Sequence, residues 1–104
     1  MDINTFEIQI WRNWKNNKTG EIFSFSPAPY ANENFKDFKL AHVKTPDNKI
    51  TYPVGYRIYE LNSKAILQIV DTIYELRRID DRLKPATMIL LDEFNNQITF
   101  TESI

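Results

Sequence analysis

The sequence contains no cysteine, and this absence excludes several kinds of chemistry at once. Disulfides, thiolate nucleophiles, cysteine-ligated zinc and iron–sulfur clusters all need the missing thiol. Glycine is also scarce, because the chain has only Gly20 and Gly55. Neither glycine lies in a phosphate-binding loop or in a G-x-S-x-G turn around a serine nucleophile. The sequence therefore argues against ATPase and serine-hydrolase activity.

Neither an excess of one charge nor a long apolar run is present. Thirteen basic residues face 14 acidic ones, for a net charge of -1, so no global field attracts nucleic acid or an anionic membrane. No stretch approaches the ~18 apolar residues of a membrane span, and the N-terminus lacks a basic and apolar leader. With 42% apolar residues in 104, we expect one compact domain, residues 1–104, in the cytoplasm and without a membrane partner.

Candidates for catalytic or metal-binding residues are few. A general base needs an oriented partner, and the single histidine, His42, has none that the sequence can place. Carboxylates do not recur at metal-ligand spacing, and Asp80-Asp81 lies among arginines, as on a solvated face. We therefore predict no catalytic site, no metal, no cofactor and no enzyme activity.

Alternation of apolar and polar residues predicts most of the secondary structure. Two hairpins are expected, with turns at residues 16–20 and at Thr45-Pro46-Asp47-Asn48, and a third turn at Asn95-Asn96. Pro53 cannot donate a hydrogen bond to a neighbouring strand, which indicates an edge position. The predicted strands are Phe6–Trp14, Glu21–Phe25, Lys39–Lys44, Lys49–Glu60, Met88–Leu91 and Gln97–Thr101.

A long amphipathic helix is predicted between the fourth and fifth of these strands. Ile66, Ile69, Ile73, Leu76 and Leu83 recur at helical spacing, Asn62 or Ser63 could cap the helix, and Pro85 would end it after about 20 residues. The expected fold class is α+β: a mainly antiparallel sheet of about five to six strands, in the order β-β-β-β-α-β-β. The helix would pack on one face and leave the other open.

The segment from Trp11 to Lys18 is the first candidate for a binding surface. It combines Trp11 and Trp14 with Arg12, Lys15 and Lys18 and contains no acid. Such residues fit a buried core with a solvated turn, a protein-binding hot spot, or a surface on which bases stack beside cations. Alternation places the two indoles on opposite faces, so at least one belongs to the core.

A second mixed patch follows in the chain. Aromatic residues exceed what one helix can cover, and Tyr30, Phe35 and Lys36 are candidates for the exposed part, extended by Phe38, Lys39, His42 and Lys44. Edge pairing with a partner strand along residues 50–58 is a further option, opposed by Pro53.

The leading hypothesis is a non-catalytic protein-binding module. A small inhibitor, immunity factor or adaptor of a low-GC bacterium, its phage or a mobile element would have this character. The alternative is a single-stranded nucleic-acid binder that uses the first hairpin, and a homodimer through the open sheet face is a further option. The salt dependence of binding distinguishes the first two hypotheses, because affinity for nucleic acid falls steeply as the salt concentration rises and affinity at an aromatic protein interface falls much less.

Overall fold

The computed structural model describes residues 2–82 and 84–103 and shows a closed antiparallel barrel of eight strands in sequential order. A short helix, α1 (Ile3–Ile10), precedes the barrel, and a 3-10 turn, η1 (Glu33–Phe35), lies between the second and third strands. The strands are β1 (Asn13–Asn16), β2 (Ile22–Pro29), β3 (Lys39–Lys44), β4 (Thr51–Leu61), β5 (Lys64–Ile69), β6 (Thr72–Asp80), β7 (Thr87–Leu91) and β8 (Gln97–Glu102).

The predicted α+β fold of five to six strands with one long helix is wrong. The segment expected to be helical forms β5 and β6, joined by the turn at Val70 and Asp71. Leu83, the last residue of the expected helical series, lies outside the described residues. Asn62 and Ser63, expected to cap that helix, both have positive φ, at 52° and 64°, and connect β4 to β5. Two such residues form the tight hairpin turn whose twist matches that of the strands.

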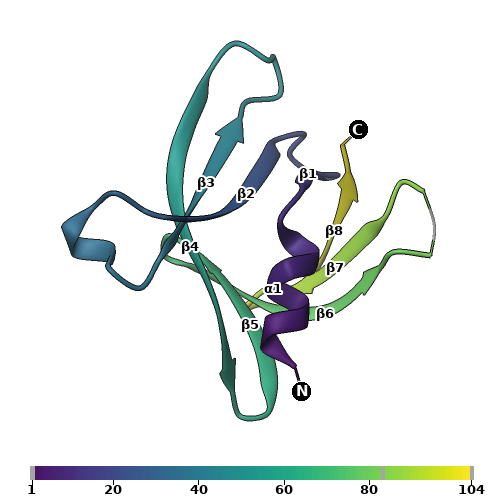
Figure 1. Cartoon of the computed structure of the whole chain (residues 1–104). Helices are drawn as coiled ribbons and strands as arrows, with labels where there is room; N and C mark the ends of the chain where they lie inside the picture. Colours follow the sequence, from purple (N-terminus) through teal and green to yellow (C-terminus); the bar gives the residue numbers. More distant parts are fainter. Residues whose placement is uncertain (1, 83, 104) are drawn as a thin grey trace.

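The first predicted strand is also wrong in its first half. Residues Ile3–Ile10 are helical, and Asp2 caps the helix by accepting a hydrogen bond from the Thr5 backbone N–H at 3.3 Å. Ile3, Phe6 and Ile10 follow helical spacing and pack against the core, whereas Ile8 is exposed. Figure 1 shows α1 lying against the barrel, where it contacts β4 and, through Gln9, the residue that follows β6.

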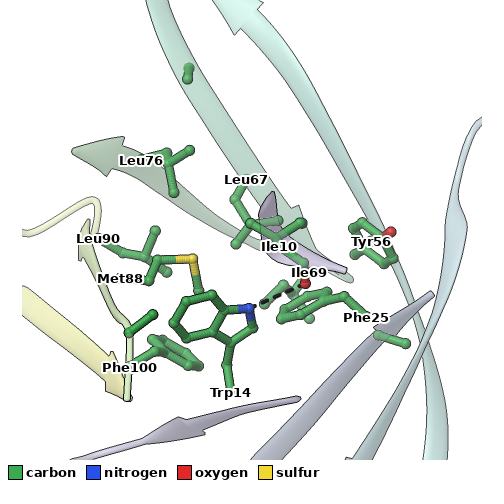
Figure 2. Close-up of a cluster of buried hydrophobic side chains, with 13 residues drawn as sticks. Ile10, Trp14, Phe25, Tyr56, Leu67, Ile69, Leu76, Met88, Leu90 and Phe100 are labelled. Carbon is green, nitrogen blue, oxygen red and sulfur yellow. Dashed lines mark hydrogen bonds between the residues drawn. The ribbon is translucent and has the colours of Figure 1, made fainter. Parts of the chain in front are cut away.

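The barrel encloses a core of large side chains. Trp14, Tyr56, Leu67, Met88 and Phe100 are at most 1% exposed, and Figure 2 shows the Trp14 indole inside the barrel beside Met88 and Phe100. Because side chains alternate along each strand, the remaining strand residues form an outer face that runs around the barrel. The sequence predicted a sheet with one face left open by the helix, and the closed barrel has no such face.

Strand β4 is long enough to belong to both halves of the barrel. Residues 51–56 pair with β3, and residues 56–61 pair with β5. The β3–β4 hairpin therefore projects from the barrel at one end, as Figure 1 shows at the top of the view. The connection that contains η1 projects at its side, between β2 and β3.

Candidate binding surface

The structure separates the two tryptophans of the first sequence candidate. Trp14 is fully buried, and its Nε1–H donates to the Ile10 carbonyl at 3.2 Å. Trp11 is half-buried, donates from Nε1 to the Tyr56 hydroxyl at 3.1 Å, and lies under the Lys39 ammonium, which is 5.6 Å from the ring centroid. Only Trp11 is thus left with partial access to solvent.

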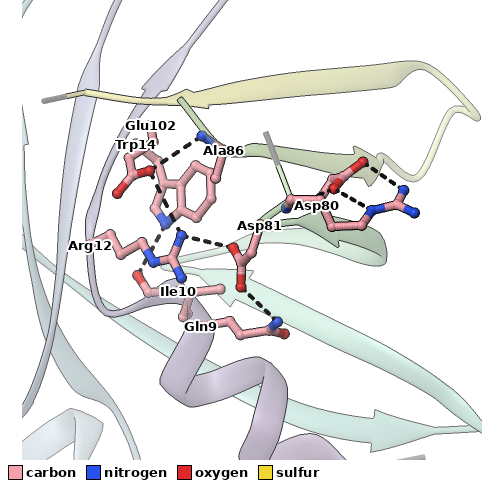
Figure 3. A network of polar contacts seen from close by, with 9 residues as sticks. Gln9, Ile10, Arg12, Trp14, Asp80, Asp81, Ala86 and Glu102 are labelled. Atoms are coloured by element: carbon pink, nitrogen blue, oxygen red, sulfur yellow. Dashed lines mark hydrogen bonds and ion pairs between the residues drawn. The ribbon is translucent and has the colours of Figure 1, made fainter. Parts of the chain in front are cut away.

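Arg12, which lies between the two tryptophans in the sequence, is already paired with acids of the same chain. Arg12 Nη1 lies 2.8 Å from Asp81 Oδ1 and 3.8 Å from Glu102 Oε1. Gln9 Nε2 donates to the other Asp81 oxygen at 3.0 Å, and the Ala86 N–H donates to Glu102 at 3.3 Å. Figure 3 shows this network, which ties α1 and β1 to the segment between β6 and β7 and to β8. The surface around Arg12 therefore carries carboxylates that would repel a nucleic-acid backbone.

Lys15 and Lys18 are exposed, and neither forms an ion pair in the Arg12 network. Lys15 pairs in register with Ile22 and Thr101 on the outer face, and Lys18 is in the turn that follows β1. The structure therefore does not bring the two indoles and three cations of the first candidate to one surface.

The second candidate forms a compact aromatic cluster outside the barrel. Phe35, at the end of η1, makes edge-to-face contacts with Tyr30 and Phe38, at centroid distances of 5.8 and 5.1 Å. All three rings are half-buried, and Lys36 beside them is exposed. Asn32 caps η1 through its side chain, which accepts from the Asn34 N–H at 3.0 Å and so holds the loop that carries Phe35.

The cluster continues onto the outer face of β4 through Phe38. Gly55 makes room for this ring, because a Cβ at that position would lie only 3.2 Å from Phe38 Cδ2. The guanidinium of Arg57 lies over both Phe38 and Tyr59, with Cζ at 5.2 and 4.6 Å from the two ring centroids. We call Tyr30, Phe35, Phe38, Arg57 and Tyr59 the aromatic–arginine patch.

A surface hollow of about 520 Å³ adjoins the patch. Tyr30, Leu40 and Pro53 give it apolar walls, and it is completed by residues of the loop that carries η1, namely Ala31, Asn32, Glu33 and Asn34. Leu40 and His42 flank the buried Ala41 in β3 and so lie on the outer face, and Pro53 pairs in register with His42. We call this hollow the Tyr30 hollow.

The backbone next to the Tyr30 hollow has a free edge. The Thr45 N–H bonds to Ile50 O, so by antiparallel alternation residues 51, 53 and 55 turn their backbone groups away from β3. Gly55 O accepts from the Val70 N–H at 2.9 Å, and the β5 ladder begins only at Tyr56. Pro53 thus occupies an edge position, where it removes a donor that a foreign strand could use.

Phe94 is a strongly exposed aromatic residue outside the patch. Phe94 is 82% exposed at the β7–β8 turn, which Asp92 holds by accepting from the N–H groups of Phe94 and Asn96, both at 2.8 Å. A smaller hollow of about 250 Å³ adjoins it, lined in part by Tyr74. Burial raises the pKa of Tyr74, and the nearby charges of Asp92 and Glu21 raise it further.

Sequence reasoning found part of the aromatic–arginine patch and missed the rest. Tyr30, Phe35 and Phe38 were predicted as members of a mixed aromatic patch, but Arg57 was not considered. A signal for it was present, because alternation puts residues 50, 52, 54, 56 and 58 on one face of the predicted strand Lys49–Glu60. The opposite face, residues 51 to 59 in steps of two, carries Pro53, Gly55, Arg57 and Tyr59.

Within the described ranges, 2–82 and 84–103, no helix is long and apolar enough to cross a membrane, and no three metal-binding side chains come together. Comparison with protein-family models, curated proteins and solved structures found no match.

Proposed function

We propose that the chain is a non-catalytic protein-binding module that docks its partner through the aromatic–arginine patch. One observation carries this proposal: five large side chains gather outside a barrel whose interior other residues already fill. Tyrosine and arginine are among the residues most enriched at the energetic centres of protein interfaces. The barrel interior is packed without these side chains. Their clustering on its outside is therefore best explained by a protein partner.

A small inhibitor, immunity factor or adaptor would act in this way, by occupying a site on another protein. The balanced charge and the absence of cysteine fit a cytoplasmic role, and the composition fits a low-GC bacterium, its phage or a mobile element. These finer attributions are part of the same proposal.

The proposal is tested by affinity purification of the tagged chain from its source cells, with and without nuclease. Wild type is compared with Phe35→Ala, which removes the central ring of the patch, and with Phe94→Ala, which removes an equally large exposed ring that is not part of the patch. We expect one stoichiometric protein to survive nuclease and high salt, to be lost with Phe35→Ala and to be kept with Phe94→Ala. Loss with Phe94→Ala alone, or capture of nothing but nucleic acid, would refute the proposal.

Circular dichroism of both variants shows whether the barrel is intact, and light scattering of wild type shows whether it binds its own copy. If Phe35→Ala unfolds the chain, Tyr59→Ala serves in its place, since that ring lies on the outer face of β4.

Single-stranded nucleic-acid binding is the second candidate, and a specific surface favours it. A hollow of about 260 Å³ on the outer face of β1 to β4 is lined by His42 and Lys44 and by no carboxylate. Its other lining residues are Asn13, Ile22, Ser24, Thr51 and Ser103. Apart from the His42 imidazole, the lining holds no aromatic ring on which a base could stack, so this candidate ranks below protein binding. Binding of a thymidine oligonucleotide that weakens steeply with salt and with Lys44→Gln would reverse the order.

A further inference from the structure

We propose that the aromatic–arginine patch recognises an extended acidic segment of the partner, with a carboxylate on Arg57 and a nearby apolar side chain in the Tyr30 hollow. This inference rests on the proposed function and adds the chemistry of the partner. It follows from the way in which Arg57 is held, from its lack of an internal carboxylate and from its distance to the hollow.

Arg57 is fixed in place before any partner arrives. Its Nε–H donates to Gln68 Oε1 at 2.9 Å, and Gln68 Nε2 donates in turn to the Val70 carbonyl at 2.9 Å. The guanidinium also lies over the rings of Phe38 and Tyr59. A side chain that is already ordered loses little further entropy when it binds, so its contacts contribute more of their energy to affinity.

Arg57 also has N–H donors that its one side-chain hydrogen bond does not use. A guanidinium carries five N–H donors in a planar fork that matches the two oxygens of a carboxylate. Arg12, Arg77 and Arg82 each pair with an acid of the chain, at 2.8, 3.2 and 3.1 Å, whereas Arg78 lies outside the patch and is exposed. Among the residues that the structure describes, Arg57 has no acid within 4.0 Å, and its one side-chain hydrogen bond uses Nε alone. An acid from outside fits this vacant side of the fork.

The Tyr30 hollow supplies the second contact at a defined spacing. Pro53, in its wall, and Arg57 are four residues apart on the same face of β4, which is roughly 13 Å along an extended strand. An extended peptide presents side chains with the same period, so the acid and the apolar residue should be about four positions apart. Because Pro53 removes a donor from the free edge, we expect side-chain contacts to dominate over a continuous ladder of backbone bonds.

The test selects peptides from a random displayed dodecapeptide library on the full-length chain. Selected peptides are synthesised, and their dissociation constants are measured by fluorescence anisotropy against wild type, Phe35→Ala, Arg57→Gln, Arg57→Lys and Arg78→Gln. Arg78 is the matched control, because it is an exposed strand arginine outside the patch. Circular dichroism confirms that each variant is folded.

We expect the selected peptides to carry Asp or Glu about four positions from a bulky apolar residue. Arg57→Gln should weaken binding about tenfold or more, since truncating one partner of a hydrogen-bonded charge pair costs at least this much. Arg57→Lys should restore only part of the affinity, because lysine lacks the planar fork, and Arg78→Gln should have no effect. Replacing the peptide acid with alanine should cost the same factor in wild type and nothing further in Arg57→Gln.

Three results would overturn the inference, and they bear differently on the proposed function. Peptides that depend on Phe35 but contain no acid, and bind Arg57→Gln equally well, would exclude the acidic partner while keeping the patch as a docking site. Failure to select any peptide sensitive to Phe35→Ala would count against both. Preference for a thymidine oligonucleotide that depends on Arg57 would replace the carboxylate with a phosphate and overturn the inference.

Discussion

At the scale of single residues, the two tryptophans have different roles although they are three positions apart. Trp14 fills the middle of the barrel and satisfies the Ile10 carbonyl, whereas Trp11 joins the end of α1 to Tyr56. The sequence predicted that at least one of them belongs to the core, which Trp14 confirms, but Trp11 precedes β1 and the strand alternation assumed for it does not apply.

Replacing Trp14 with phenylalanine should destabilise the barrel strongly. The smaller ring leaves a cavity and removes the donor to Ile10 O, so we expect a loss of about 2–4 kcal/mol in the free energy of unfolding. Denaturant titration followed by circular dichroism measures the loss. Lys15→Ala, at the exposed neighbouring position, should change it by less than about 0.5 kcal/mol. Equal effects of the two substitutions would contradict the described core.

The raised pKa of the Tyr56 hydroxyl leads us to expect a loss of stability at high pH. Burial raises the pKa of its hydroxyl from 10.0 to about 12, partly offset by the hydrogen bond from Trp11. The unfolded chain therefore loses this proton first, so the contribution of Tyr56 to stability is complete below pH 10 and is lost as the pH rises through about 12.

Ultraviolet absorbance of the tyrosinate group, compared between wild type and Tyr56→Phe, isolates the titration of Tyr56. The difference between the two curves should have its midpoint well above 10.0. A midpoint at the ordinary value would show that the hydroxyl is not enclosed between Trp11 and the Ser26 carbonyl, which accepts from it at 2.7 Å.

At the scale of elements, the hairpins at β3–β4 and β7–β8 were predictable and the β5–β6 hairpin was not. Thr45 to Asn48 and Asn95-Asn96 contain recognisable turn residues, whereas β5 and β6 meet at Val70-Asp71, which does not signal a turn. Because no turn was indicated there, the segment was treated as one element. The isoleucines at 66, 69 and 73 happen to have helical spacing, which favoured a helix. Their β-branched side chains, together with those of Val70 and Thr72, favour strands. The prediction gave this preference less weight than the helical spacing.

The β5–β6 turn should become more stable when Val70 is replaced. Val70 has φ of 55°, a conformation that costs a β-branched residue about 1–2 kcal/mol, and its side chain is exposed. Val70→Asn keeps the backbone bonds of residue 70 to Gly55 and Gln68, so we expect a higher midpoint of thermal unfolding. Thr72→Asn, at an exposed position in β6 with ordinary φ, is the control and should give no gain. An unchanged or lower midpoint for Val70→Asn would refute the assignment of strain to this turn.

At the scale of the whole molecule, closure of the barrel could not be read from local patterns. Closure depends on the pairing of β1 with β8, residues separated by most of the chain, and on the Arg12–Asp81 contact that holds α1 and β1 beside the segment after β6. Periodicity gives the face that a strand buries but not its neighbours in space. For the same reason, the sequence could not show that Arg57 of β4 lies next to Phe38, in the loop before β3.

Docking of α1 against the barrel predicts a contrast between two isoleucines of one helix. Ile10 is fully buried and Ile8 is 60% exposed. Ile10→Ala should lower the free energy of unfolding by about 2–5 kcal/mol, and Ile8→Ala by less than about 0.5 kcal/mol. Denaturant titrations of the two variants measure the difference. Similar losses would mean that α1 does not pack as described.

Hydrogen exchange of the chain, free and bound to the partner captured with it, tests the central claim most directly. If the aromatic–arginine patch is the docking surface, binding should slow exchange of backbone amides in residues 30–40 and 51–59 and leave the turn at residues 92–96 unchanged. Protection of residues 92–96, or of the first hairpin alone, would contradict the claim and place the partner elsewhere on the barrel.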